Sequence, residues 1–172
     1  MFEKGYQGHD GTLLYQPMVH IPLIIRMPRQ QEGRVLAVNA EQIDIAPTLL
    51  DVLGLKIPPW MEGESLKKAM EQSSVRSKPK FSMSVDVFGN NGGFRTGSIA
   101  VSHEQYKLVL HLDKKEKELF DLSKDPGEQS NLLHLKREEA RFLESMMRKR
   151  ISFLRPSRYH ADRDFPERET CP

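Results

Sequence analysis

Two groups of side chains in this sequence have types and spacings that could do chemistry, and the first lies near the N-terminus. In "KGYQGHDGTLLY", His9 stands in a glycine-rich turn and Lys4 precedes it. An imidazole exchanges protons near neutral pH, and in this turn it could face a cleft ahead of the apolar run at residues 19–25. The alternatives stay open that His9 is an exposed loop histidine and Lys4 a solvated terminal lysine.

The second group consists of carboxylates in the segment "ELFDLSKDPGEQSN": Glu118, Asp121, Asp125 and Glu128. Such a set could suggest a calcium loop, but the spacing does not match that of an EF-hand. Asp125 is followed by proline and glycine, which is turn chemistry. We therefore predict a structural turn here and no metal site.

Other reactive residues are sparse. The single cysteine, Cys171, is the penultimate residue, which excludes an intrachain disulfide and a cysteine-based metal site. No cluster of aspartates suited to a hard cation precedes Tyr15. Asp44 stands just before a helical pattern, so we predict that it caps that helix. His103 and His111 lie in the region of the predicted small sheet and are expected to be structural or exposed.

The elements that would position His9 come next in the chain. Residues 19–25, "VHIPLII", are short, rich in β-branched residues and bounded by prolines, which predicts a strand buried on both faces of a large sheet. His20 is expected to pack within this strand. Proline removes a ladder donor, so Pro22 should stand near the start of the strand.

A helix is predicted after Asp44. Four apolar residues at positions i, i+3, i+4 and i+7 would form one helical face: Ala46, Leu49, Leu50 and Leu53. Pro47 suits a first turn, and Gly54 suits the end of the helix. A second, shorter helix is predicted from Ser65 to Gln72.

The character of the sequence changes after Lys80. The alternating segment 80–89 leads into the turn "GNNGG", and three more strands are predicted: Ser98–Ser102, Tyr106–His111 and Lys117–Asp121. A long amphipathic helix follows from Lys136 to Leu154, with one apolar stripe: Ala140, Leu143, Met147, Ile151 and Leu154. The sequence thus predicts an α/β part at residues 1–72, an antiparallel sheet with one long helix at residues 80–155, and an irregular tail at residues 156–172.

Composition excludes several classes of function. The chain has 172 residues, 38% of them hydrophobic, and a net charge of +2, which is too small to indicate binding to nucleic acid or to a membrane. The longest apolar run contains a proline and an arginine and cannot span a bilayer. No signal-peptide pattern is present at the N-terminus, so the chain as written is expected to be soluble and cytoplasmic.

Three segments carry a family resemblance: "LLYQPMVHIPLIIRMP", "QIDIAPTLLDVLGLKIPPWMEGESL" and "YKLVLHLDKKEKELFDLSKDPGEQSNL". In this order and at this spacing, over residues 8–133, they resemble the C-terminal third of a sulfatase, a member of the alkaline phosphatase superfamily. The resemblance implies that residues 1–72 are the terminal part of a catalytic α/β domain and residues 80–155 its C-terminal subdomain. The chain would then be a fragment whose partner is the missing N-terminal part of that domain.

The resemblance also implies a chemistry. Sulfatases cleave sulfate esters with a formylglycine made from the cysteine or serine of a C/S-x-P-x-R motif, and a calcium ion offsets the sulfate charge. Lysine and histidine side chains bind the sulfate oxygens, and the family often carries one of them in the turn before the tyrosine. On that basis His9, and less well Lys4, would be substrate-binding residues in the complete enzyme.

This sequence lacks the nucleophile motif. Residues 154–158, "LRPSR", imitate its tail, but Leu154 stands where the cysteine would be. We therefore assign no catalytic residue and no metal ligand to the chain, and we expect it to be inactive alone. Two alternatives stay open: a fragment of a related phosphonate monoester hydrolase or phosphodiesterase, and a non-catalytic interaction module. The sequence does not identify the substrate.

Overall fold

A computed structural model describes residues 13–36, 38–71, 78–88 and 94–153. Within them, one four-stranded antiparallel sheet has the strand order β1-β2-β3-β4. The strands are β1 (Lys80–Phe88), β2 (Phe94–His103), β3 (Tyr106–His111) and β4 (Glu116–Asp121). The three strands predicted between residues 98 and 121 are confirmed, and the first of them is longer than expected. The "GNNGG" turn and the predicted tail lie outside the described residues.

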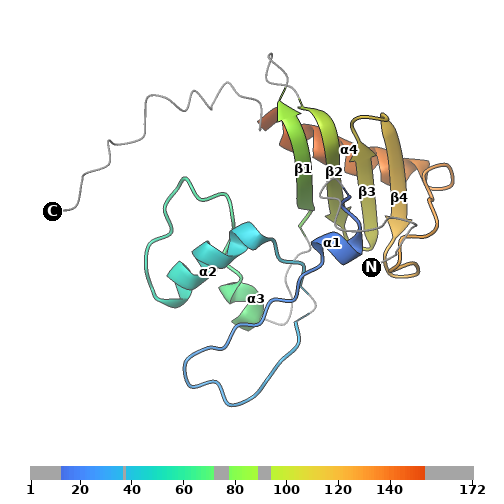
Figure 1. Cartoon of the computed structure of the whole chain (residues 1–172). Helices are drawn as coiled ribbons and strands as arrows, with labels where there is room; N and C mark the ends of the chain where they lie inside the picture. The colour runs from blue at the N-terminus through green and yellow to red at the C-terminus, as the bar shows by residue number, and fades with distance from the viewer. Residues whose placement is uncertain (1–12, 37, 72–77, 89–93, 154–172) are drawn as a thin grey trace, which may run out of the picture.

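One face of this sheet is covered by α4 (Arg137–Phe153), as Figure 1 shows. Glu138 and Glu139 lie in its first turn and Arg150 in its last, an arrangement that complements the helix dipole. The predicted apolar stripe is confirmed within the described residues. Its members Ala140, Leu143 and Met147 are buried against alternate residues of the strands: Ile99, Val101, Leu108 and Leu119.

The opposite face of the sheet holds a second, smaller core. The intervening strand residues Ala100, Val109 and Phe120 pack there against Leu14. Tyr15 and Val19 also pack against this core, at the two ends of the short helix α1 (Gln16–Val19). The period of two along each strand therefore sends one set of side chains to α4 and the other to residues 14–19.

Residues 20–71 contain a short 3-10 helix (η2, Gln42–Asp44) and the helices α2 (Ile45–Val52) and α3 (Lys67–Glu71). The predicted helix after Asp44 is confirmed, and Gly54 ends it with φ at +70°, a conformation that glycine adopts freely. The apolar face of this helix is largely uncovered among the described residues. Leu49 and Leu53 are 51% and 70% exposed, while Pro47 and Thr48 are the buried residues of α2.

The strand predicted at residues 19–25 does not form. Val19 ends α1, and residues 20–25 run without regular structure, with Ile21 64% and Ile24 91% exposed. A strand needs a neighbour for its backbone hydrogen bonds, and none of the described residues pairs with this segment. His20 is also exposed, so the expectation that it packs inside a strand is wrong.

The fold class is therefore a small mixed α/β structure, with an antiparallel sheet and a C-terminal helix. A larger α/β sheet at residues 1–72 stays a prediction. None of the helices in the described part of the chain is long and apolar enough to cross a bilayer.

Candidate functional site

Polar side chains meet on the sheet face that carries α1. The Tyr15 hydroxyl donates to Glu118 Oε2 at 2.6 Å, and His111 Nε2 lies 2.9 Å from the same oxygen. On the far side of the ring, His111 Nδ1 lies 3.0 Å from Ser98 Oγ. The Tyr15 ring also meets Phe120 edge-on, with centroids 6.2 Å apart. This row of side chains crosses strands β2, β3 and β4 and ends on the residue that precedes α1.

A serine, a histidine and a glutamate in a row can serve in nucleophilic catalysis. Here Ser98 is buried at 2% exposure, so its hydroxyl cannot reach a substrate in solution. Tyr15 further occupies the carboxylate oxygen that contacts His111. The row therefore acts as a dock that holds Tyr15 on the sheet. This agrees with the structural role expected for His111.

A buried ion pair reinforces the dock one residue further along the chain. Lys107 Nζ lies 2.8 Å from Glu128 Oε1, and the two side chains are 1% and 0% exposed. The other oxygen of Glu128 accepts the backbone N–H of Gln16 at 2.5 Å. Glu128 adopts a φ of +56°, which is uncommon for a residue with a side chain. The backbone of Glu128 thus lies in the left-handed region, and in this conformation its carboxylate contacts both Lys107 and the N–H of Gln16.

The segment that precedes Glu128 forms the structural turn expected from the sequence. Asp121 Oδ1 accepts hydrogen bonds from the backbone and the hydroxyl of Ser123, and Asp125 Oδ2 accepts the N–H of Ser130. The bonds from Ser123 hold the pKa of Asp121 below its usual range. These carboxylates are thus engaged in local turn bonds.

Asp44 joins three separate parts of the chain. Its carboxylate accepts the N–H of Glu41 and the N–H of Glu64, each at 2.8 Å, and Lys80 Nζ lies 3.2 Å away. Burial favours the neutral acid, but the two N–H groups and the ammonium together hold the pKa of Asp44 below its usual range.

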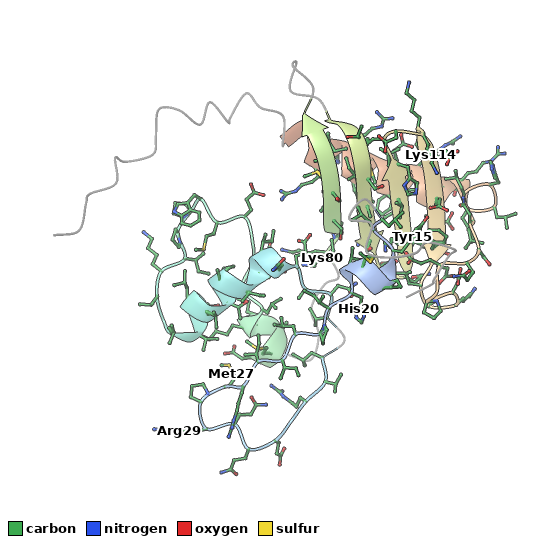
Figure 2. The ribbon with its side chains drawn as sticks, in the orientation of Figure 1. Tyr15, His20, Met27, Arg29, Lys80 and Lys114 are labelled. Atoms are coloured by element: carbon green, nitrogen blue, oxygen red, sulfur yellow. The ribbon has the colours of Figure 1, made fainter. Side chains whose placement is uncertain are left out.

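The prediction that Asp44 caps α2 is wrong in its contacts. The residue occupies the N-cap position, but its side chain makes no capping bond to that helix. The carboxylate is instead taken by Glu64 and by Lys80 at the start of β1, which Figure 2 shows close to the beginning of α2. Gly63 makes this approach possible, because a Cβ atom there would lie 2.0 Å from the carbonyl oxygen of Ile43.

His9 and Lys4 lie outside the described residues, so the structure neither supports nor opposes their predicted role. Within residues 13–36, 38–71, 78–88 and 94–153, no group of three His, Cys, Asp or Glu side chains could hold a metal ion. The described side chains therefore do not offer a fitting calcium site. The structure instead adds the dock at Tyr15 and Gln16, directly after the segment that contains His9.

Residues 20–71 expose an unusual amount of apolar surface. Large hydrophobic side chains at least a third exposed are Ile21, Leu23, Ile24, Val35, Leu36, Ile43, Leu49, Leu53, Leu55 and Trp60. Apolar surface concentrated in one region marks an interaction site more often than scattered single residues do. We call this set the apolar surface of residues 20–71.

Comparison with protein families gives one match over most of the chain. The family model described as "N-sulphoglucosamine sulphohydrolase, C-terminal" matches residues 3–156. Among curated proteins, Arylsulfatase K of Xenopus laevis is 26% identical over 147 residues, which cover 81% of this chain and 27% of that protein. N-acetylglucosamine-6-O-sulfatase of Bacteroides thetaiotaomicron is 28% identical over 138 residues, which cover 76% of this chain and 24% of that protein.

Solved structures give the same picture of the fold. The phosphonate monoester hydrolase SpPMH from Silicibacter pomeroyi aligns with a TM-score of 0.52 at 22% identity, over 74% of this chain and 27% of that one. At this identity the likeness shows the fold alone. In every case the chain spans about a quarter of the length of the relative that it matches.

Proposed function

Because this chain belongs to the sulfatase family and corresponds to its C-terminal region, we propose that it forms part of an enzyme that hydrolyses sulfate esters. The observation that carries the proposal is the family match over residues 3–156. The names of two relatives, an arylsulfatase and an N-acetylglucosamine-6-O-sulfatase, support sulfate esters as the substrate class.

The apolar surface of residues 20–71 supports different roles for the N-terminal and C-terminal parts of this chain within the proposed enzyme. Burial of apolar surface contributes about 25 cal/mol per Å², so side chains such as Ile24 and Trp60 would gain stability against a partner. In the proposal, residues 1–72 complete a catalytic α/β domain. Residues 80–155 form the subdomain that carries the sheet, and residues 156–172 an irregular tail.

His9, with Lys4 as a second choice, is proposed to contact the sulfate group. A sulfate monoester is an anion, and charged imidazole or ammonium groups stabilise it and its leaving group. The support from this structure is indirect. Tyr15 and Gln16 are held by Glu118 and Glu128, which would fix the chain six residues after His9.

The reaction also needs groups that we do not assign to this chain. The sequence contains no C/S-x-P-x-R motif, and the described residues offer no calcium site. A formylglycine would supply the nucleophile, and calcium would offset charge on the sulfate. We therefore expect the isolated 172-residue chain not to hydrolyse aryl sulfates.

A chimera tests the proposal. The C-terminal quarter of the Bacteroides thetaiotaomicron N-acetylglucosamine-6-O-sulfatase is replaced by residues 1–156 of this chain, and release of sulfate from N-acetylglucosamine 6-sulfate is measured. We expect activity in the chimera and none in the host enzyme truncated at the same point. A soluble, folded chimera as inactive as the truncated host would contradict the proposal.

The role of His9 is tested in the same chimera. His9→Ala should lower kcat/KM by about 10²-fold or more, the usual scale for a group that transfers a proton or stabilises charge. His134→Ala is the matched control, because His134 is exposed on the loop before α4. Equal effects of the two substitutions would remove His9 from the site and leave the family assignment intact.

A phosphonate monoester hydrolase is the second candidate, because SpPMH, which bears that name, shares the fold of this chain. The two candidates differ in the reacting group, so the chimera should be assayed with a phenyl phosphonate ester beside the sulfate ester. Turnover of the phosphonate alone would select the second candidate.

A further inference from the structure

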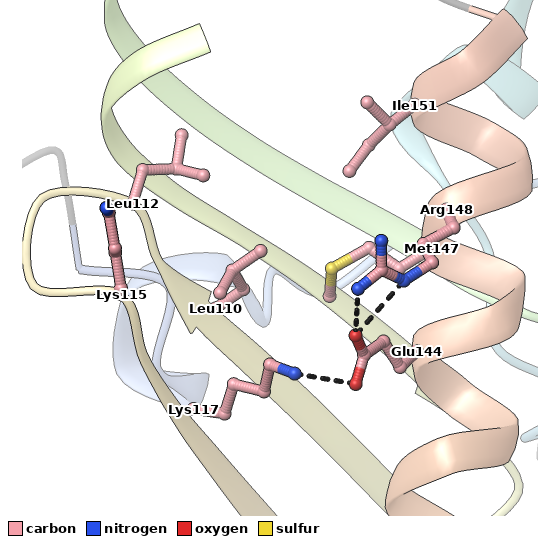
Figure 3. A pocket seen from close by; sticks show the side chains of 8 residues that line it. All are labelled: Leu110, Leu112, Lys115, Lys117, Glu144, Met147, Arg148 and Ile151. Carbon is pink, nitrogen blue, oxygen red and sulfur yellow. Dashed lines mark hydrogen bonds and ion pairs between the residues drawn. The ribbon is translucent and has the colours of Figure 1, made fainter.

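A hollow lies between the β3–β4 hairpin and the C-terminal half of α4, on the sheet face opposite α1. Its volume is about 440 Å³, within the range of sites for small ligands. Figure 3 shows its apolar wall, formed by Leu110 and Leu112 of the hairpin and by Met147 and Ile151 of the helix. Leu110 and Leu112 stay partly exposed at the hairpin end.

Charged side chains surround this apolar wall. Lys115, Lys117 and Arg148 line the hollow together with one carboxylate, Glu144. Three cations and one anion leave a surplus of two positive charges. Lys115 forms no ion pair or hydrogen bond with the described residues, and Figure 3 shows it beside Leu112 at the hairpin end.

Glu144 holds two of the cations in place. Its two oxygens accept a bond from Lys117 Nζ at 2.6 Å and bonds from Arg148 Nε and Nη2 at 3.1 and 2.5 Å. The bond from Lys117 and, after it, that from Arg148 hold the pKa of Glu144 below its usual range, although partial burial opposes this. Both cations keep N–H groups beyond those that Glu144 accepts.

This arrangement lowers the entropic cost of binding an anion. Lysine and arginine side chains lose considerable freedom when a ligand immobilises them, and here the carboxylate has already fixed two of them. An anion placed over the hollow would meet the remaining N–H groups. An apolar body attached to it would cover Leu110, Leu112 and Ile151, which are all partly exposed.

We propose that this hollow, which we call the hairpin site, binds a small organic anion whose apolar body lies on Leu110, Leu112 and Ile151 and whose charged group meets Lys115, Lys117 and Arg148. Sulfate and carboxylate groups share the chemistry required. The site is independent of the proposed function, because it uses only residues of the β3–β4 hairpin and α4 and its test measures binding.

The test titrates the full 172-residue chain with hexyl sulfate and follows the Met147 methyl resonance by NMR after labelling of the methionines. Met147 lines the hollow, so its shift places the ligand there. Hexanoate tests the carboxylate in place of the sulfate. Inorganic sulfate and hexanol test the charged group and the apolar body separately. We expect hexyl sulfate to cause saturable shifts. Inorganic sulfate and hexanol should each bind more weakly by about tenfold or more.

Two double variants locate the charge requirement. Lys115→Gln with Arg148→Gln should weaken hexyl sulfate binding by about tenfold, because two charged donors are lost. Lys56→Gln with Lys124→Gln removes the same charge from exposed positions elsewhere and should leave affinity unchanged. If the variant with both Lys115→Gln and Arg148→Gln does not fold, the single variant Lys115→Gln is used. Residue 115 has a φ of +55°, and glutamine adopts this conformation at the same cost as lysine.

The proposal is overturned by inorganic sulfate or hexanol binding as tightly as hexyl sulfate, because the site would then be an ion site or an apolar hollow only. It is equally overturned if neither organic anion moves the Met147 resonance, or if the two double variants bind alike. Comparable binding of hexanoate supports an organic-anion site, and weaker binding of hexanoate narrows the ligand to sulfate esters.

Discussion

The sheet with α4 and the segment at residues 20–71 use apolar side chains in opposite ways. Ten of the twelve buried hydrophobic residues in the described part of the chain lie on the sheet or α4, an eleventh is Leu14, which docks on the sheet, and only Ala69 belongs to residues 20–71. Of the thirteen large hydrophobic side chains that are exposed among the described residues, ten belong to residues 20–71.

The difference shows which part carries its own stability. The sheet buries one core under α4 and another under residues 14–19, so both its faces are covered. Residues 20–71 are held mainly by polar contacts around Asp44 and Thr48. The Thr48 hydroxyl donates to the Asp44 carbonyl and accepts the N–H of Leu66. The first region is folded around apolar side chains, and the second leaves most of its large apolar side chains exposed.

Breaking the buried ion pair should have the largest effect on the sheet region. Glu128→Gln leaves Lys107 charged and buried without its carboxylate, so the free energy of unfolding should fall by about 3–5 kcal/mol. Glu64→Gln is the matched control in residues 20–71, because Glu64 pairs with Lys78 on the surface and should contribute less than about 1 kcal/mol. Urea unfolding followed by circular dichroism measures both, and similar losses would contradict the contrast.

Leucine truncation tests the same contrast with apolar groups. Leu119→Ala opens a cavity under α4 and should lower the free energy of unfolding by about 2–4 kcal/mol. Leu53→Ala removes the same atoms from a side chain that is 70% exposed, and the change should stay within about 0.5 kcal/mol. A large effect of Leu53→Ala would mean that residues 20–71 have a core after all.

Glycine substitution tests whether residues 20–71 have fixed local structure. Gly63→Ala places a Cβ against the carbonyl of Ile43, so the backbone must shift and about 1–3 kcal/mol should be lost. Gly33→Ala meets nothing within 4 Å and should be neutral. Hydrogen exchange of the Glu64 amide, which bonds to Asp44, reports this local change. An unchanged exchange rate of the Glu64 amide in Gly63→Ala would contradict the close contact between Gly63 and the carbonyl of Ile43.

The charge on Asp44 should make its contacts depend on pH. Its pKa is lower in the folded chain than the unfolded value of about 4, so its contribution is present above pH 4 and is lost as pH falls through the folded pKa. Asp44→Asn should therefore destabilise by about 1–2 kcal/mol at pH 7 and by less at pH 2. Glu32→Gln, an exposed change, is the control. A constant difference across this range would count against the charge as the cause.

The smallest effect on stability is expected at the apolar surface itself. Trp60→Ser with Leu55→Ser should change the free energy of unfolding by less than about 0.5 kcal/mol per residue but reduce self-association, because both side chains are more than half exposed. Leu135→Ser, at an isolated exposed leucine beside α4, should leave association unchanged. Light scattering after size-exclusion chromatography compares the self-association of the two variants. Equal self-association would mean that the apolar surface of residues 20–71 does not drive association.

Sequence patterns predicted the elements whose signals are local. The stripe of Ala140, Leu143 and Met147 needs only helical spacing, and the strand at residues 106–111 is marked by a short run of apolar residues between polar turns. The strand at residues 19–25 was wrong because strand formation depends on a neighbour, and the chain supplies none among the described residues. Likewise, periodicity identified the apolar face of α2 but could not show that this face is largely exposed, because spacing does not reveal whether a partner covers it.

The site contacts could not be predicted for a related reason. Tyr15 and Glu118 are 103 positions apart, and Gln16 and Glu128 are 112 apart, so only the register of the sheet and the docking of α1 bring them together. Asp44 had a local explanation as a cap, but Glu64 and Lys80 compete for the same oxygens. The role of His9 remains a prediction.

The dock at Tyr15 and Gln16 makes the sheet region discontinuous in sequence. Residues 14–19 lie on the sheet beside strands that follow them by about 80 to 100 positions, and the described residues between α1 and β1 add no strand to this sheet. The segment between α1 and β1 is therefore anchored to the sheet at both of its ends, like an insertion in a loop. A proteolytic nick within it should leave the two pieces held together by the sheet, and changes in its length need not disturb the strand register.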